Sequence, residues 1–177
     1  MHLLTVGHSN RALQDLLALL AAHDVEAIAD VRRHPASRRH PHFAGTALAR
    51  SLSEARIAYA HVPELGGLRE PRAESPHTAL ADGPFRGYAD HMASDEFARG
   101  VAKLLALAAS RRTAVLCAEA DPAHCHRSLL ADVLLARGHR VEHIVDAGPA
   151  RPHTLHHHAR AEGGTVVYDG AQRRLPL

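Results

Sequence analysis

Aromatic residues are scarce in this sequence: tryptophan is absent, and phenylalanine and tyrosine contribute three residues each. Proteins that bind single-stranded nucleic acid stack bases on aromatic rings, so this composition disfavours that class. Lysine is nearly absent too, because Lys103 is the only lysine among 21 basic residues. The other cations are arginines, whose guanidinium groups suit paired hydrogen bonds to phosphate or carboxylate.

Long hydrophobic runs and cysteines are also few. No apolar stretch reaches the length of a membrane span, and the N-terminal residues lack the basic segment of a signal peptide. Two cysteines in 177 residues exclude a disulfide framework, so Cys117 and Cys125 are either structural thiols or chemically functional ones. The net charge of +2 is too small for a DNA coat. We expect a cytoplasmic protein without a membrane partner.

The length and the 46% share of hydrophobic residues fit one domain over residues 1–177. Apolar runs typical of strands alternate with runs of helical spacing. We expect strands at 3–9, 25–32, 57–63, 113–119 and 139–146, and helices at 12–23, 47–56, 94–110 and 126–138. This alternation predicts a three-layer α/β/α fold with a mostly parallel central sheet of about five strands.

The chain changes character after Asp146, so we treat 147–177 as a C-terminal extension of a core at about 3–146. The extension has one candidate helix and a short strand from Thr165 to Tyr168, followed by an Asp169–Gly170 turn. Its last residues are expected either to pair as an edge hairpin or to be mobile.

Polar side chains follow four of the expected strands. In open parallel sheets, ligands bind outside the carboxyl ends of the strands, where the following loops converge. Two long connections, at 32–45 and 64–88, lie at these ends, and connections of that length are commonly functional. We expect a shared cleft that includes residues of these ends: His8, Ser9, Asn10, Asp30, Arg32, Glu64, Gly66, Gly67, Cys117 and Glu119.

Each of these residues also has a plain structural interpretation. Ser9 or Asn10 can cap the helix that begins near Arg11. Asp30 can pair with a neighbouring arginine, a contact that contributes about 0–1 kcal/mol at a surface. The Gly66–Gly67 pair marks either a turn with positive φ or a close approach of the backbone to a phosphate.

Residues 117–128 are the most informative stretch, because they join a buried strand to a helix through a loop rich in acids and histidines. We expect Cys125, His126 and Arg127 at the N-terminus of that helix, where free N–H groups favour anions and a thiol is biased toward thiolate. The alternative is that Cys125 only packs and that Arg127 pairs with Glu119 or Asp121. Cys117, on the strand, is the better candidate for a buried and inert thiol.

The 17 histidines raise the question of a metal. The run His124-Cys125-His126 lacks the spacing of a closed zinc site, and no Cys-x-x-Cys pair accompanies it. His153 and His156–His158 could share one face of a helix, although such a cluster binds nickel whether or not a metal has a cellular role. We predict no metal site, and the sequence identifies no cofactor and no oligomeric state.

Arginines concentrate in the two long connections and at the start of the expected helix at 126–138. Together they indicate an anionic ligand, with phosphate the best match for the guanidinium fork. The alternatives are a solvated basic face or a patch that contacts duplex nucleic acid. The residues concerned are Arg32, Arg33, Arg38, Arg39, Arg69, Arg72, Arg86 and Arg127.

Five ordered blocks resemble the bacterial and archaeal family known as domain of unknown function 488, which is functionally uncharacterised: TVGHSNR (5–11), ADVRRHPASRRHPHF (29–43), HVPELGG (61–67), FRGYADHM (85–92) and CAEADPAHCHRSLLADVLLARG (117–138). The resemblance covers about residues 3–146. It implies motif positions at His8, Ser9, Asn10, Asp30, Arg32, Ser37, Glu64, Gly66, Gly67, Arg86, Gly87, Tyr88, Cys117, Glu119, Cys125, His126 and Arg127.

Our leading hypothesis is an enzyme that acts on a small anionic substrate, such as a nucleotide or another phosphorylated compound. Arg32, Arg86 and Arg127 would hold the anion, and Glu119 or Asp30 would act as general acid or base. Cys125 or Cys117 would be the nucleophile or a ligand, with Glu64 and His8 as further acid/base candidates. The alternatives are a nucleic-acid-binding or processing protein that uses the arginine-rich loops, and a metal or redox sensor built on cysteine and histidine.

Overall fold

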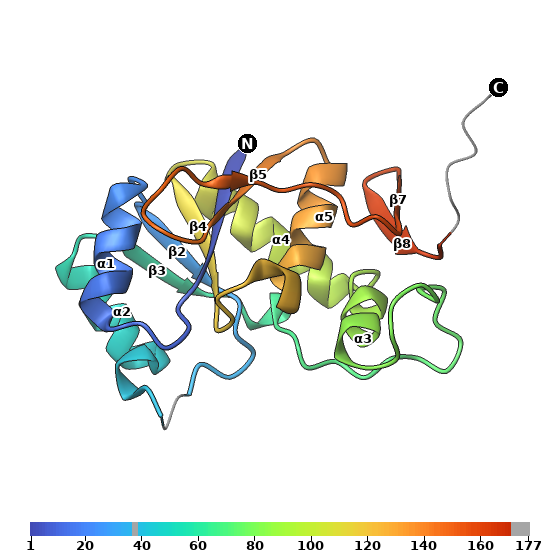
Figure 1. Ribbon diagram of the computed structural model, residues 1–177, viewed down its shortest axis with the longest axis horizontal. Helices are drawn as coiled ribbons and strands as arrows, with labels where there is room; N and C mark the ends of the chain where they lie inside the picture. The colour runs from blue at the N-terminus through green and yellow to red at the C-terminus, as the bar shows by residue number, and fades with distance from the viewer. Residues whose placement is uncertain (37–38, 171–177) are drawn as a thin grey trace.

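The computed structural model describes residues 1–36 and 39–170, and its centre is a six-stranded sheet of order β3-β2-β4-β1-β5-β6 (Figure 1). The first five strands of this order pair in parallel, and β6 pairs with β5 in the antiparallel sense. The strands are β1 His2–Gly7, β2 Ala27–Asp30, β3 Ala58–His61, β4 Thr113–Cys117, β5 Arg140–Ile144 and β6 Arg151–Pro152. The predicted α/β class is confirmed, and the two-residue β6 adds a sixth strand.

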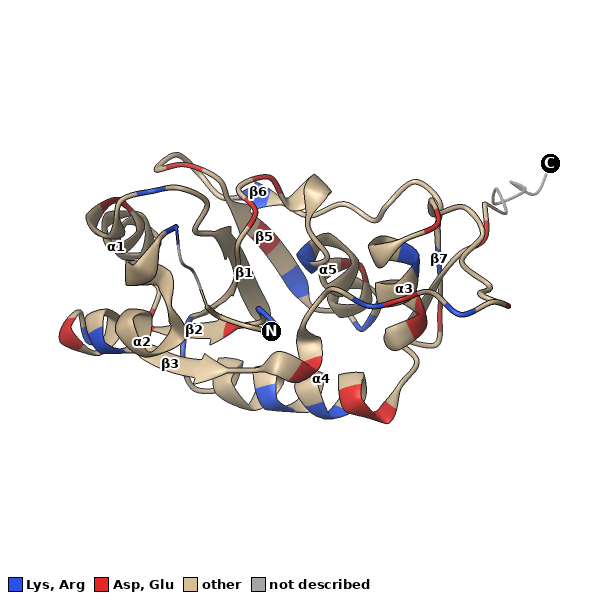
Figure 2. Ribbon diagram, turned by 90° about the horizontal axis from the view of Figure 1, so that it is seen from below, with Lys and Arg blue, Asp and Glu red and all other residues tan. Residues whose placement is uncertain are grey.

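Helices cover both faces of the sheet (Figures 1 and 2). Alternate residues of β1 point to opposite faces: Leu3 packs into a cluster with α4 and α5, whereas Leu4 packs with α1 and α2. The helices are α1 Leu13–Ala22, α2 Gly45–Glu54, α3 Pro84–His91, α4 Asp95–Ala108 and α5 Arg127–Ala136, with short 3₁₀ turns η1 Pro41–Phe43, η2 Pro63–Leu65 and η3 Pro122–His124. Two apolar layers therefore hold the sheet between helices.

Two segments differ from the sequence-based expectation. The connection at 64–88 contains the start of α3, whose first turn includes Pro84 and Gly87, residues typical of loops. In the C-terminal extension, the expected helix around His153–His158 is absent: the segment forms loop and turn. The predicted strand at Thr165–Tyr168 is confirmed as β8, which pairs with β7 Ala159–Glu162. The expectation for the last residues, 171–177, falls outside the described part of the chain.

The C-terminal extension is held on the core by one buried carboxylate of α5. Asp132 accepts a hydrogen bond from His153 Nε2 at 2.8 Å and another from the His156 amide at 3.0 Å. Its second oxygen accepts from the Tyr168 hydroxyl at 2.7 Å. Because Asp132 has no exposed surface, these contacts replace the water that its charge would otherwise require.

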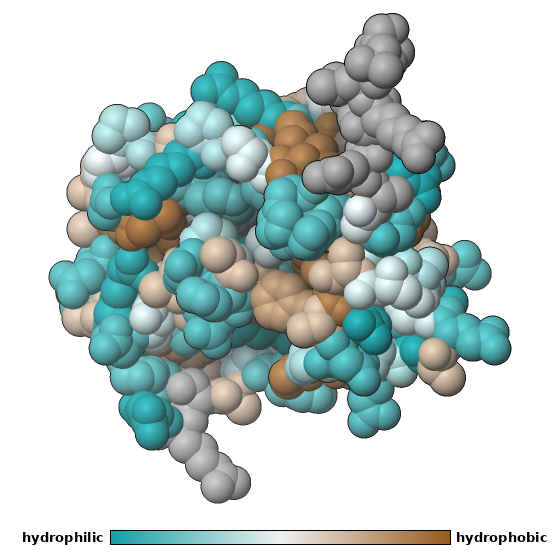
Figure 3. All heavy atoms as spheres, turned by 45° about the vertical axis from the view of Figure 1, so that its right-hand side comes forward, coloured by the Kyte–Doolittle hydropathy of each residue, from teal (hydrophilic) through white to brown (hydrophobic). Residues whose placement is uncertain are grey.

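The surface seen in Figure 3 is mostly hydrophilic, with small and separate hydrophobic patches. Among the described residues, no helix combines the length and the apolar character that crossing a bilayer requires.

Candidate functional site at the carboxyl ends of the strands

A pocket of about 370 Å³ lies where the parallel strands end, beside the start of α5. It brings together seven of the expected site residues, from the ends of β1, β2 and β4 and from the loops that follow. These are His8, Arg32, Gly67, Cys117, Glu119, Cys125 and His126. Loops that are distant in sequence thus meet at one edge of the sheet.

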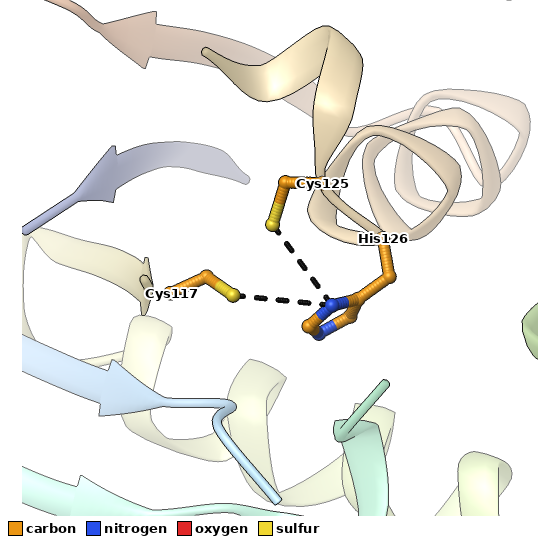
Figure 4. Close-up of side chains that lie close together, drawn as sticks. All are labelled: Cys117, Cys125 and His126. Atoms are coloured by element: carbon orange, nitrogen blue, oxygen red, sulfur yellow. Dashed lines mark hydrogen bonds between the residues drawn. The ribbon is translucent and has the colours of Figure 1, made fainter. Parts of the chain in front are cut away.

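Two thiols and one imidazole form the buried end of this pocket (Figure 4). Cys117 is the last residue of β4, and Cys125 lies two residues before α5. Their exposed fractions are 5% and 2%, and both cysteines are free. Each sulfur lies 3.9 Å from Nδ1 of His126, and all three atoms lie within 4.8 Å of one another. Cys117 is therefore buried as expected, but it shares its environment with Cys125.

The thiol pair favours one negative charge, located on Cys125. A hydrogen bond from the Cys117 thiol lowers the pKa of Cys125, and His126 and Arg127 add to this effect. The same hydrogen bond, together with burial, raises the pKa of Cys117. This asymmetry agrees with the thiolate bias expected for a cysteine near a helix N-terminus.

Arg127 supports the loop that carries these groups. It is 1% exposed, and its guanidinium donates to the backbone carbonyls of Glu119 at 2.5 Å and Ala120 at 2.7 Å. It pairs with neither the Glu119 nor the Asp121 carboxylate, and among the described residues it forms no ion pair. Arg127 therefore fixes the β4–α5 loop and does not line the pocket, where we had expected it to hold the anion.

Arg32 lines the pocket, but its charge is already compensated. Asp30, which is fully buried, accepts from Arg32 Nε at 2.9 Å and Nη2 at 2.5 Å. Arg32 Nη1 also donates to the Phe43 carbonyl at 2.8 Å and lies 3.2 Å from His8 Nε2. The pairing expected for Asp30 is thus present as a buried ion pair, and Asp30 itself does not line the pocket.

His8 is a neutral neighbour of this ion pair at neutral pH. Burial lowers the pKa of His8 to about 4, and the nearby Arg32 charge contributes. Its Nδ1 lies 2.8 Å from the Ser9 carbonyl, which is compatible only with an N–H at Nδ1. Nε2 then remains as the acceptor that faces Arg32.

The two adjacent glycines make room for side chains. A Cβ on Gly67 would lie 2.6 Å from Nδ1 of His126, and one on Gly66 would lie 2.8 Å from Cβ of Arg33. Gly66 has φ of −74°, and neither glycine has positive φ. The turn with positive φ expected here is therefore wrong, and Gly67 permits the close approach of the imidazole to the backbone.

One family model, described as domain of unknown function DUF488, matches residues 12–134. The chain belongs to the DUF488 family. Neither a curated protein nor a solved structure matches it. The DUF488 match includes every residue of the pocket except His8, and it ends before β5 and the C-terminal extension.

Several residues singled out by the DUF488 resemblance lie outside the pocket. Arg86 donates to the Leu80 carbonyl, and Glu64 pairs with Lys103, which lowers the pKa of the Glu64 carboxyl. Buried Tyr88 donates to the Leu65 carbonyl and packs its ring 4.8 Å from that of His126. Gly87 admits the backbone of Arg69, because a Cβ there would lie 2.2 Å from the Arg69 carbonyl oxygen.

The remaining expectations concern the first two loops. Ser9 and Asn10 do not cap α1, because its N-cap is Ala12 and makes no side-chain hydrogen bond. Ser9 adopts φ of 51° and lies outside the pocket with Asn10. Ser37 and Arg38 fall outside the described residues.

Eight further residues line the pocket, of which only Arg33 was named in the sequence analysis as an anion-binding candidate: Arg33, His34, Ala36, Leu68, Pro84, Phe85, Ala118 and His124. Arg33 and His34 lie in the arginine- and histidine-rich connection that the sequence marked as functional, so a signal for them existed. No sequence signal pointed to Leu68. It is 75% exposed and adopts φ of 60°, which is rare for a bulky residue.

Proposed function

We propose that the protein is an enzyme that binds a small anionic substrate, a nucleotide or another phosphorylated compound, in this pocket. The observation that carries the proposal is the exposed guanidinium of Arg33 in the lining. Arg33 is exposed at the pocket, donates only to the Leu68 carbonyl at 3.2 Å, and forms no ion pair among the described residues. Among the described residues that line the pocket, Glu119 is the only acidic one.

The size of the pocket supports a small molecule as the ligand. About 370 Å³ lies within the usual range for sites that enclose metabolites. Beside its bond to the Leu68 carbonyl, the Arg33 guanidinium keeps further N–H donors, and a guanidinium can present two of them to phosphate oxygens. The N-terminus of α5 opens beside Cys125 and adds a favourable field for negative charge.

The reactive groups of the proposed enzyme are the two thiols at the buried end and the carboxylate at the rim. Cys117 and Cys125 supply a nucleophile or a pair of ligands. Glu119 is exposed at the pocket, so its carboxylate can exchange protons with substrate and water as a general acid or base.

The charge pattern favours this proposal over the nucleic-acid alternative. Arg69 pairs with Glu96, and Arg72 donates to the Asp90 carbonyl, so these loop arginines are already engaged. Acidic and basic residues are interspersed over the ribbon in Figure 2, whereas a duplex-binding face gathers cations.

The test measures anion binding by thermal shift and calorimetry with inorganic phosphate and a panel of nucleoside monophosphates. We expect a rise in Tm, and a loss of affinity of about 10- to 100-fold in Arg33→Ala, because a hydrogen bond to a charged group contributes about 1.5–3 kcal/mol. Arg50→Ala, an exposed arginine of α2, is the matched control and should bind like the wild type. The proposal is overturned if no anion of the panel raises Tm, or if Arg33→Ala binds as tightly as Arg50→Ala.

A further inference from the structure

We propose that Cys117, Cys125 and His126 form a binding site for a thiophilic metal ion, with Zn²⁺ as the expected occupant. Two thiolates and one imidazole are a donor set that selects zinc over magnesium or calcium. The sequence had predicted no metal site, because the spacing within the run at 124–126 is unsuitable. The third donor comes from the end of β4, eight residues earlier in the chain.

The positions of the three donor atoms fit one shared ion. Usual bond lengths of about 2.3 Å to sulfur and 2.0 Å to nitrogen place the two atoms about 3.5 Å apart around a tetrahedral ion. Both sulfurs lie 3.9 Å from Nδ1 of His126, and the three donor atoms lie within 4.8 Å of one another, so shifts of up to about 1 Å bring them around one ion. Two equal and long separations from one nitrogen fit an ion between the donors better than a single hydrogen bond.

The imidazole is held with Nδ1 toward the sulfurs. Gly67 lies against this edge of the ring, and the ring of Tyr88 packs 4.8 Å from it. Nε2 of His126 is buried and has no hydrogen-bond partner in the described part of the chain. The two thiols are thus the polar groups that the ring faces, as Figure 4 shows.

Three protein donors leave a fourth position open toward the pocket. Catalytic zinc sites keep such a position for water or substrate, whereas structural sites fill all four with protein ligands. A metal ion here would offer a Lewis acid to an oxygen of a small anion. This last step rests on the proposed function, whereas metal binding itself does not.

Metal-free, reduced full-length protein titrated with Co²⁺ tests the site. We expect one equivalent to bind with a thiolate-to-cobalt charge-transfer absorption, and Zn²⁺ to displace it. Cys117→Ser, Cys125→Ser and His126→Gln should each remove or strongly weaken this absorption. Gly67→Ala, which adds a Cβ against the imidazole, should weaken binding about 10- to 100-fold, the usual effect of disturbing the support of a ligand.

His124→Gln is the matched control, since His124 lines the same pocket but lies outside the donor cluster. His156 and His157 line a different pocket, and among the described residues His156–His158 are not part of the cysteine-containing donor cluster, so metal bound there should give no thiolate-to-cobalt absorption. The proposal is wrong if cobalt binds without that absorption, or if both serine variants of folded protein retain it. The phosphate titration of metal-free protein is a separate measurement, so failure of the anion proposal and failure of the metal site are distinguishable.

Discussion

The buried carboxylate of Asp30 determines which of the neighbouring arginines can bind a ligand. Its carboxylate accepts four hydrogen bonds: from the backbone N, Nε and Nη2 of Arg32 and from the Tyr59 hydroxyl. A buried carboxylate requires such partners, because desolvation of an isolated charge is costly. Arg32 is thereby committed to Asp30, and the adjacent Arg33 remains available to a ligand.

We expect Asp30→Ala to lower the free energy of unfolding by about 3–5 kcal/mol, because it leaves the Arg32 charge buried without a partner. Urea denaturation followed by circular dichroism measures this. Glu54→Ala removes an exposed pair with Arg50 on α2, and it should change the free energy of unfolding by less than about 1 kcal/mol. If Asp30→Ala and Glu54→Ala changed the free energy of unfolding equally, the buried Asp30–Arg32 pair would not have the stabilising role given to it here.

At the scale of elements, the sequence predicted what depends on apolar periodicity. The five parallel strands contain short apolar runs, the helices α1, α2, α4 and α5 contain apolar residues at helical spacing, and all were located. The helix α3 was missed because its first turn, Pro84 to Gly87, reads as loop. The helix expected at 153–158 was wrong, because the contacts of His153 and His156 with Asp132 determine that segment's path.

The helix α4 has a side-chain N-cap, unlike α1 and α2. Ser94 accepts a hydrogen bond from the Phe97 amide at 3.1 Å, whereas α1 and α2 begin at alanines without a side-chain cap. We expect Ser94→Ala to lower the free energy of unfolding by about 1 kcal/mol, and Ser94→Asp to preserve it. Chemical denaturation checks this, with the exposed Ser53→Ala as control. A Ser94→Ala variant as stable as Ser53→Ala would contradict the role of the cap.

At the scale of the molecule, the rule for parallel sheets located the pocket, but it did not assign roles within it. The ends of β1, β2 and β4 converge as predicted, and Cys117, Cys125 and His126 meet there. The expected anion-binding role of Arg127 depended on an open guanidinium, and this group is engaged by two backbone carbonyls. Hydrogen-bond partners that are brought together only by the fold cannot be read from the spacing of residues in the sequence. The location of a site is therefore more predictable than the role of each residue in it.

A buried chain of polar groups joins the sheet to the C-terminal extension. Thr5 Oγ1 lies 2.7 Å from His143 Nδ1, His143 Nε2 lies 2.9 Å from His153 Nδ1, and His153 Nε2 lies 2.8 Å from Asp132. With His143 neutral, every member of this chain has a donor for each acceptor. A proton added to His143 places N–H groups on both of its ring nitrogens, so Nδ1 no longer accepts from the Thr5 hydroxyl, which must turn and accept instead.

This chain predicts that acid weakens the fold. Burial lowers the pKa of His143 to about 4, and the charges of His153 and Arg127 contribute. An unfolded histidine has a pKa of about 6.5, so between pH 6.5 and 4 the unfolded chain binds more protons than the folded one. The free energy of unfolding is therefore highest above pH 6.5 and decreases as the pH falls from 6.5 to 4, by up to about 3 kcal/mol for His143.

His143→Gln cannot take up a proton and should show a shallower decline in urea midpoint between pH 6.5 and 4, whereas His124→Gln, on the exposed surface, should follow the wild type. An identical slope in wild type and His143→Gln would exclude His143 as the group that titrates.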